Sequence, residues 1–163
     1  MRRARTVFGI ALPLLLLGVI APPAGAAVYG GTSGPSNAFV LVTEGRSLTA
    51  TAVWIDARCA DGSTLSYQGP IDFSRGTPTG QREGEIVIGG NRIGSTGRFT
   101  SKGGGPADYG QNTAQLTVTM TGRVTRRSAR GTMELTAALT DKATQQPSTT
   151  CSSGKINWRA RSS

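Results

Sequence analysis

The chain has 163 residues, of which 17% are charged, with two cysteines, no histidine and a formal net charge of +9. Without histidine, Ser-His-Asp and Cys-His catalysis and histidine metal sites are excluded. The G-x-S-x-G nucleophile motif does not occur either, which removes the usual α/β-hydrolase mechanism.

The first 26 residues have the order of a secretory signal peptide, in which a basic start, an apolar run and a small-residue end follow one another. The apolar run covers residues 7–20, and the arginines before it are Arg2, Arg3 and Arg5. That run is shorter than the roughly 20 residues that a membrane-spanning helix needs. We predict cleavage after Ala26 or Ala27, which leaves residues 27–163 as a single domain without a membrane span, secreted or associated with the cell wall.

Residues 37–59 are expected to form two strands joined by a turn at residues 44–46. Apolar residues alternate along the second strand up to Cys59, so a period of two directs Cys59 towards the core. The other cysteine is Cys151. In an exported chain an even pair of cysteines predicts one disulfide. Trp54 lies on the polar face of the same strand, where it either caps a second packing layer or is partly exposed.

Shorter strands are expected at residues 64–68, 71–73, 85–93 and 98–101. The segment "GGGPADYGQN", residues 103–112, has the composition of a loop. No window outside the leader has helical periodicity, so the whole pattern predicts an all-β domain. We expect a single antiparallel β-sandwich or small β-barrel of about seven to nine strands, closed by one disulfide.

The clearest predicted element is a hairpin around "GRVTRRSARGT", residues 122–132. Apolar residues alternate on both sides of it. When Val124 faces Ala129 across a loop of residues 125–128, every apolar residue meets an apolar partner on one face. A slip of one residue would turn the whole set outward, so the register is well specified. Met120 then pairs with Met133.

This register places Arg123 directly opposite Arg130, with Arg126 and Arg127 at the tip of the hairpin. Like charges in direct cross-strand apposition cost a few tenths to about 1 kcal/mol. An anion bridging the guanidinium groups would remove that cost, because paired guanidinium groups suit phosphate, sulfate and carboxylate. The simpler interpretation is that exposed arginines separate into water, where salt screens their repulsion.

The last predicted strand, within residues 151–163, turns Trp158 to the core. Its polar face carries Lys155, Arg159 and Arg161, which extend the basic surface if this strand lies beside the hairpin. The charge distribution agrees with such a surface. Residues 27–122 contain seven basic and seven acidic residues, whereas residues 123–163 contain eight basic and two acidic ones. This asymmetry is typical of chains with an anionic partner, although solubility alone also explains it.

Carboxylates are the remaining candidates for catalysis. Glu83 and Glu85 are close in sequence, and Asp56, Asp61 and Asp72 lie near predicted strand ends. A glycosidase needs two acids roughly 5–10 Å apart across a cleft, so a small carboxylate-dependent hydrolase is one alternative function. Solvated surface positions are the simpler interpretation of all five residues.

We therefore predict a non-enzymatic β-domain without cofactor or metal. Its candidate anion-binding residues are Arg123, Arg126, Arg127, Arg130, Lys155, Arg159 and Arg161. The expected partner is an acidic wall polymer or an extracellular polysaccharide. Nucleic acid is not expected, because no aromatic residue interrupts the basic segment of the hairpin. A small-molecule binder, with its ligand in a barrel mouth or a cleft between sheets, is the second alternative.

The order of several short motifs resembles that of a group of small secreted β-domain proteins from high-GC Gram-positive bacteria. The chain contains "VYGGTS" after the leader, then "ARCADGS", "GRFTSKGG", "TGRV…ARGTMEL" and "CSSGKINWRAR". The group follows the plan YGG-x-T, RC-x-DG and C-x-(S/T)G-x-(I/V)-x-W-x-A-R. The resemblance covers nearly the whole predicted mature chain and implies that Cys59 pairs with Cys151 and that Trp158 is structural. The group has no established activity, so the resemblance implies fold and export alone.

Overall fold

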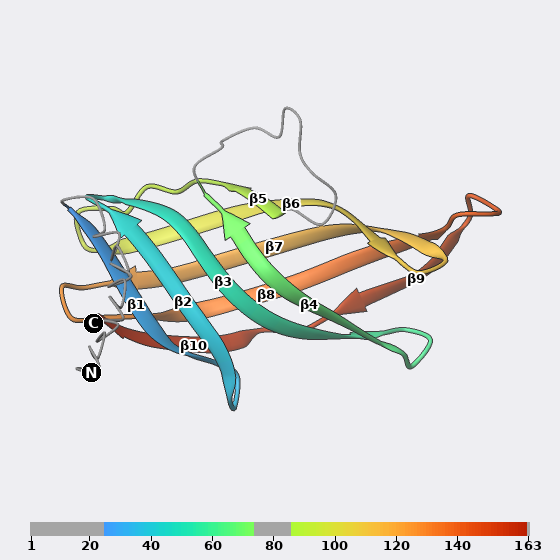
Figure 1. Ribbon diagram of the computed structural model, residues 1–163, viewed down its shortest axis with the longest axis horizontal. Helices are drawn as coiled ribbons and strands as arrows, with labels where there is room; N and C mark the ends of the chain where they lie inside the picture. Colours follow the sequence, from blue (N-terminus) through green and yellow to red (C-terminus); the bar gives the residue numbers. More distant parts are fainter. Residues whose placement is uncertain (1–24, 74–85, 163) are drawn as a thin grey trace, which may run out of the picture.

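The computed structural model describes residues 25–73 and 86–162, and within these ranges the chain forms ten β-strands and no helix (Figure 1). The strands are β1 (Ala26–Ser33), β2 (Asn37–Glu44), β3 (Ser47–Cys59), β4 (Thr64–Asp72), β5 (Ile86–Gly89), β6 (Arg98–Tyr109), β7 (Asn112–Val124), β8 (Ser128–Asp141), β9 (Pro147–Ser152) and β10 (Ile156–Ser162). The all-β prediction is confirmed. The sequence did not predict β1 and β9, and the two short strands expected at residues 64–68 and 71–73 are the single strand β4, so the total exceeds the expected number by one.

All ten strands belong to one sheet, in the order β10-β1-β2-β3-β4-β5-β6-β7-β8-β9. The sheet closes into a ring, because β10 also pairs with β8 and β9 also pairs with β3. Neighbouring strands are antiparallel except β4 and β5, which make a short parallel contact. In Figure 1, β1–β4 run diagonally across a layer that contains β7 and β8, and the core lies between these two layers.

The predicted hairpin is formed by β7 and β8 with the expected register. Val124 pairs with Ala129, Gly122 with Gly131 and Met120 with Met133, and the pairing continues to Asn112 and Asp141. Because β8 begins at Ser128, three residues remain outside the strands at the tip. Thr125 closes this loop through its backbone N–H, which donates to the Ser128 carbonyl at 2.8 Å.

The prediction of a loop at residues 103–112 is wrong except at Gly110 and Gln111, which form the turn between β6 and β7. Strand β6 continues through this segment to Tyr109 and pairs with β7 along its whole length. Glycines occur here because neighbouring backbones come very close. A Cβ atom on Gly103 would lie 2.0 Å from the Val87 carbonyl oxygen, and one on Gly104 would lie 2.0 Å from the Leu116 carbonyl oxygen. The glycines that are typical of a loop are therefore required by the sheet.

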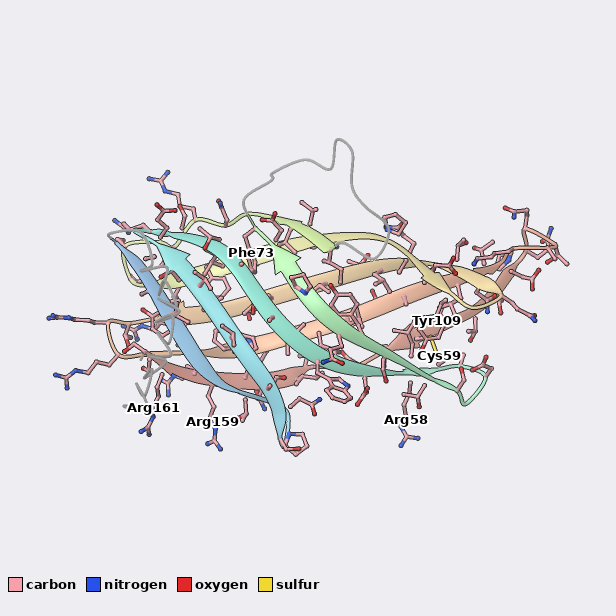
Figure 2. The ribbon with its side chains drawn as sticks, viewed as in Figure 1. Arg58, Cys59, Phe73, Tyr109, Arg159 and Arg161 are labelled. Carbon is pink, nitrogen blue, oxygen red and sulfur yellow. A yellow bond between two sulfur atoms is a disulfide. The ribbon has the colours of Figure 1, made fainter. Side chains whose placement is uncertain are left out.

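A disulfide joins Cys59 on β3 to Cys151 on β9, two residues that also pair in the sheet (Figure 2). The predicted covalent link is thus confirmed. It closes a loop with a sequence separation of 92 residues. In the chain-entropy model such a loop stabilises the folded state by roughly 4–5 kcal/mol. The link also fastens β9 to β3, which share a pairing of only two residues.

The core is apolar and contains Trp158, which is 2% exposed. Its ring stacks on Phe39, with ring centroids 4.8 Å apart and an interplanar angle of 17°. The prediction that this residue fills the core is confirmed. Trp54, in contrast, is 44% exposed. Strand β1 begins at Ala26, next to the predicted cleavage points, whereas residues 1–24 of the predicted leader lie outside the described residues. Within the described residues, no helix is long and apolar enough to cross a membrane.

Candidate functional site: an arginine row across four strands

Four arginines stand in register across four neighbouring strands. Arg98 on β6 pairs with Arg123 on β7, Arg123 pairs with Arg130 on β8, and Arg130 pairs with Arg159 on β10. All four side chains are exposed. Because neighbouring strands lie about 4.8 Å apart, the four Cα atoms span about 14 Å. We call these four residues the arginine row.

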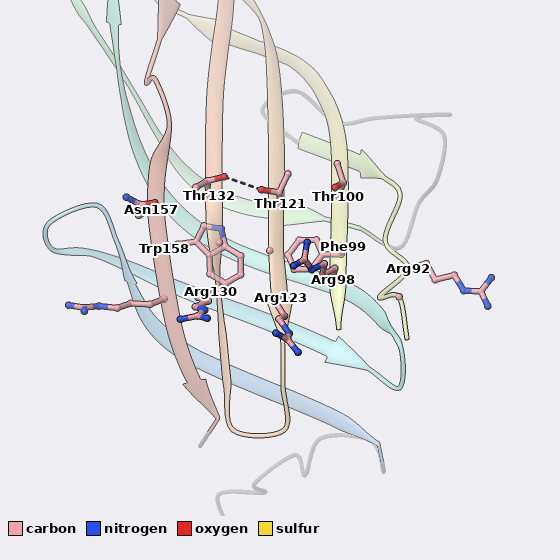
Figure 3. Close-up of a pocket in the computed structure, with 14 residues that line it drawn as sticks. Arg92, Arg98, Phe99, Thr100, Thr121, Arg123, Arg130, Thr132, Asn157 and Trp158 are labelled. Carbon is pink, nitrogen blue, oxygen red and sulfur yellow. Dashed lines mark hydrogen bonds between the residues drawn. The ribbon is translucent and has the colours of Figure 1, made fainter. Parts of the chain in front are cut away.

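A second line of polar residues runs parallel to the arginine row. Thr100, Thr121, Thr132 and Asn157 occupy the next outward-facing positions on the same four strands and are also in register. The hydroxyl groups of Thr121 and Thr132 lie 3.0 Å apart and share a hydrogen bond. Figure 3 shows Arg123 and Arg130 extending from neighbouring strands below this hydrogen bond. We call these four residues the hydroxyl–amide row.

The two rows border an open groove of about 940 Å³. Between them lie the backbones of Phe99, Gly122, Gly131 and Trp158, whose side chains, where present, point into the core. The two glycines make room for the indole. A Cβ atom on Gly122 would lie 2.5 Å from Trp158 Cζ2, and one on Gly131 would lie 2.7 Å from the same atom. The floor of the groove is therefore smooth backbone supported by a buried aromatic ring.

The electrostatics of the groove are one-sided. Among the described residues, no carboxylate lies within 4.0 Å of a guanidinium group of the arginine row. The ion pair between Lys142 and Asp108 lies outside the groove, near the end of β6. Arg123 Nε donates a hydrogen bond to the Thr96 carbonyl oxygen at 3.2 Å. The acid that shares the outward face of β8 is Glu134, four residues from Arg130. The positive charge of the row thus has no acidic partner in the part of the chain that the structure describes.

The seven predicted anion-binding residues fall into two sets. Arg123, Arg130 and Arg159 belong to the arginine row. The other four are exposed residues outside the row, and we call them the peripheral set: Arg126, Arg127, Lys155 and Arg161. The last strand, β10, lies beside β8 of the hairpin, as an extended basic surface requires. Figure 2 shows Arg159 and Arg161 projecting from the same side of β10.

Sequence reasoning missed Arg98. The alternation of Arg98, Thr100 and Lys102 with buried Phe99 and Ser101 indicates an outward face for this strand. Its place beside Arg123, however, follows only from the pairing of β6 with β7. That pairing was hidden because the residues that follow have the composition of a loop.

The predicted carboxylates do not gather in the described residues. Asp61 accepts hydrogen bonds from Ser63 Oγ at 2.7 Å and from Ser63 N at 2.9 Å, and these bonds lower the pKa of its carboxyl group. Asp56 Oδ1 instead accepts a bond from Trp54 Nε1. Glu83 and Glu85 lie outside the described residues. Within the described ranges, no group of three histidine, cysteine or acidic side chains is placed to hold a metal ion.

The chain matches no protein-family model, no curated protein and no solved structure.

Proposed function

We propose that the chain is an exported, non-enzymatic domain that binds a linear anionic polymer of the cell envelope or extracellular space along the arginine row. One observation carries this proposal, namely the register of Arg98, Arg123, Arg130 and Arg159. Each of the three adjacent pairs costs a few tenths to about 1 kcal/mol of repulsion in the free protein. An anionic ligand removes this repulsion, so the same free energy that destabilises the free protein favours binding of the ligand.

The geometry favours an extended ligand that lies across the strands. The four guanidinium groups of the arginine row border one side of the groove, hydroxyl and amide groups border the other, and Arg92 also lines it. Guanidinium groups bind phosphate, sulfate or carboxylate with directed, charge-assisted hydrogen bonds. A polymer with anionic groups on one side and hydroxyl groups on the other satisfies both borders at once. The basic leader and the disulfide support export, because disulfides persist in oxidising compartments.

Two variants that remove the same number of charges test the proposal. The row variant replaces the four arginines of the arginine row by glutamine. The control variant replaces the peripheral set by glutamine, so both proteins lose four positive charges. Binding to sodium polyphosphate and to polygalacturonate is measured by calorimetry at 50 and 150 mM salt, because exposed electrostatic contacts weaken as salt increases.

We expect the row variant to bind at least one of the two polymers about 100-fold more weakly, since hydrogen bonds to charged groups contribute about 1.5–3 kcal/mol each. The peripheral variant should lose less than about tenfold, the share of general charge attraction. Equal losses in both variants would show that only net charge matters. A wild-type protein that binds neither polymer at 50 mM salt would also refute the proposal.

A further inference from the structure

The outward face of β1–β3 carries all of the large exposed hydrophobic side chains that the structure describes: Val28, Val40 and Trp54, with exposed fractions of 37%, 36% and 44%. This face lies on the layer that crosses the arginine-row strands in Figure 1. The alternation of β3 explains why Trp54 points outward, because Val53 and Ile55 on either side of it are buried. Exposure of an indole has a hydrophobic cost, so its position calls for a physical reason.

The polar groups of Trp54 have hydrogen-bond partners. Its Nε1–H donates to Asp56 Oδ1 at 3.2 Å, and the same oxygen accepts a hydrogen bond from Ser66 Oγ. The Asn37 side chain donates to the Trp54 carbonyl oxygen at 3.2 Å. The polar atom of the indole is therefore already satisfied, and what remains for a ligand is the apolar surface of the ring.

Polar groups lie next to this ring on β3 and β4. Gln68 on β4 pairs directly with Trp54 and is exposed. The bonds from Trp54 and Ser66 both fall on Oδ1 of Asp56, which leaves Oδ2 available to a donor. Ala52, two residues before the indole on the same face, is small and exposed, and it pairs with Val40 on β2 and with Pro70 on β4. An aromatic surface bordered by an amide and a carboxylate oxygen fits a ligand that is apolar on its face and polar at its edge.

We infer that Trp54 is the stacking platform of a second binding site, which takes a neutral polysaccharide. The C–H groups on the face of a pyranose ring are weakly positive and meet the negative face of the indole. The equatorial hydroxyl groups of the sugar then reach Asp56 Oδ2 and the Gln68 amide. The charged groups on this face of β3 are Asp56 and Arg58, of opposite sign. An acidic sugar would therefore gain no net attraction, and the site is separate from the arginine row.

Affinity electrophoresis tests this inference without involving the proposed polyanion site. Hydroxyethylcellulose, xylan, mannan and dextran are cast into separate native gels, and the mobility of the protein is compared with that in a gel without polymer. The xylan and mannan are preparations free of uronic acid and phosphate, so none of the four probes is anionic and the arginine row gives no response. The variants are Trp54→Ala, Trp54→Phe and Val40→Ala, none of which changes the charge of the protein.

We expect at least one polymer to retard the wild-type protein. Trp54→Ala should weaken that binding by about two- to tenfold, which is the scale of one aromatic stacking interaction. Trp54→Phe should keep part of it, and Val40→Ala, which removes a comparably exposed apolar side chain from the same face, should keep all of it. Retardation by none of the four polymers overturns the inference, as does equal retardation of Trp54→Ala. A wild-type dimer that Trp54→Ala dissociates would identify the face as a self-association surface and would overturn it too.

Discussion

Replacing Gly122 by alanine is expected to destabilise the protein through one identifiable steric clash. The added Cβ atom would lie 2.5 Å from Trp158 Cζ2, 2.8 Å from its Cη2 and 2.9 Å from the Arg130 carbonyl oxygen. Carbon atoms in favourable contact lie about 3.5–4.0 Å apart, so the ring must move by about 1 Å. It has little freedom to do so, because it is buried and packs against the rings of Phe39 and Phe99.

Overpacking a filled core by one methyl group costs about 1–3 kcal/mol. We therefore expect Gly122→Ala to lower the free energy of unfolding by about 2 kcal/mol and the melting temperature by about 6–10 °C for a domain of this size. Urea denaturation followed by circular dichroism measures the change. Gly30→Ala is the matched control on β1, where an added Cβ would meet nothing within 4 Å. Its effect should stay within about 0.5 kcal/mol.

A double-mutant cycle identifies the cause. Trp158→Phe removes the six-membered part of the indole, which contains both ring atoms near Gly122. In that background Gly122→Ala should cost at least about 1 kcal/mol less than in the wild-type protein, which is a coupling typical of residues in contact. If Gly122→Ala is as stable as wild type, or costs the same in both backgrounds, the account of the groove floor is refuted.

Two further predictions concern the disulfide and acid sensitivity. Replacing both Cys59 and Cys151 by alanine should lower the free energy of unfolding by roughly 4–5 kcal/mol, the value for a closed loop of 92 residues; unfolding at the wild-type urea concentration would contradict this. Hydrogen bonds from Ser63 and from Thr144 lower the pKa of Asp61 and Asp141, respectively, below the ordinary value of 3.8. These carboxylates therefore stabilise the fold above pH 3.8, and their contribution is lost as the pH falls through the lowered pKa values. Carboxyl NMR titration should place both transitions below 3.8, and a transition at or above 3.8 in either residue would be inconsistent with these bonds.

The sequence predicts strands well where apolar and polar residues alternate strictly. The register of β7 with β8 follows from such alternation, because any slip would expose a row of apolar residues. Strand β1 escapes prediction because only Tyr29 and Ser33 of its eight residues are buried. Strand β9 was not predicted for a similar reason, since Cys151 is its only buried residue.

The candidate site illustrates a different difficulty. Three members of the arginine row lie within or beside the predicted hairpin and could be found from its pattern. Arg98 joins them through the pairing of β6 with β7, and that pairing depends on glycines at positions where other backbones come close. Composition cannot distinguish these glycines from those of a loop. Glycine is favoured in a loop and at a close approach of two backbones for the same reason, the absence of a side chain.

The most direct measurement of the proposed function follows the Nε–Hε NMR signals of the individual arginines at 150 mM salt during two titrations, one with sodium polyphosphate and one with polygalacturonate, and evaluates the polymer that binds more tightly. The account predicts that Arg98, Arg123, Arg130 and Arg159 shift together with a single dissociation constant, while Arg58, exposed on the outward face of β3, does not shift. Equal shifts of Arg58 and the arginine row, or no shift of the row at all, would contradict it.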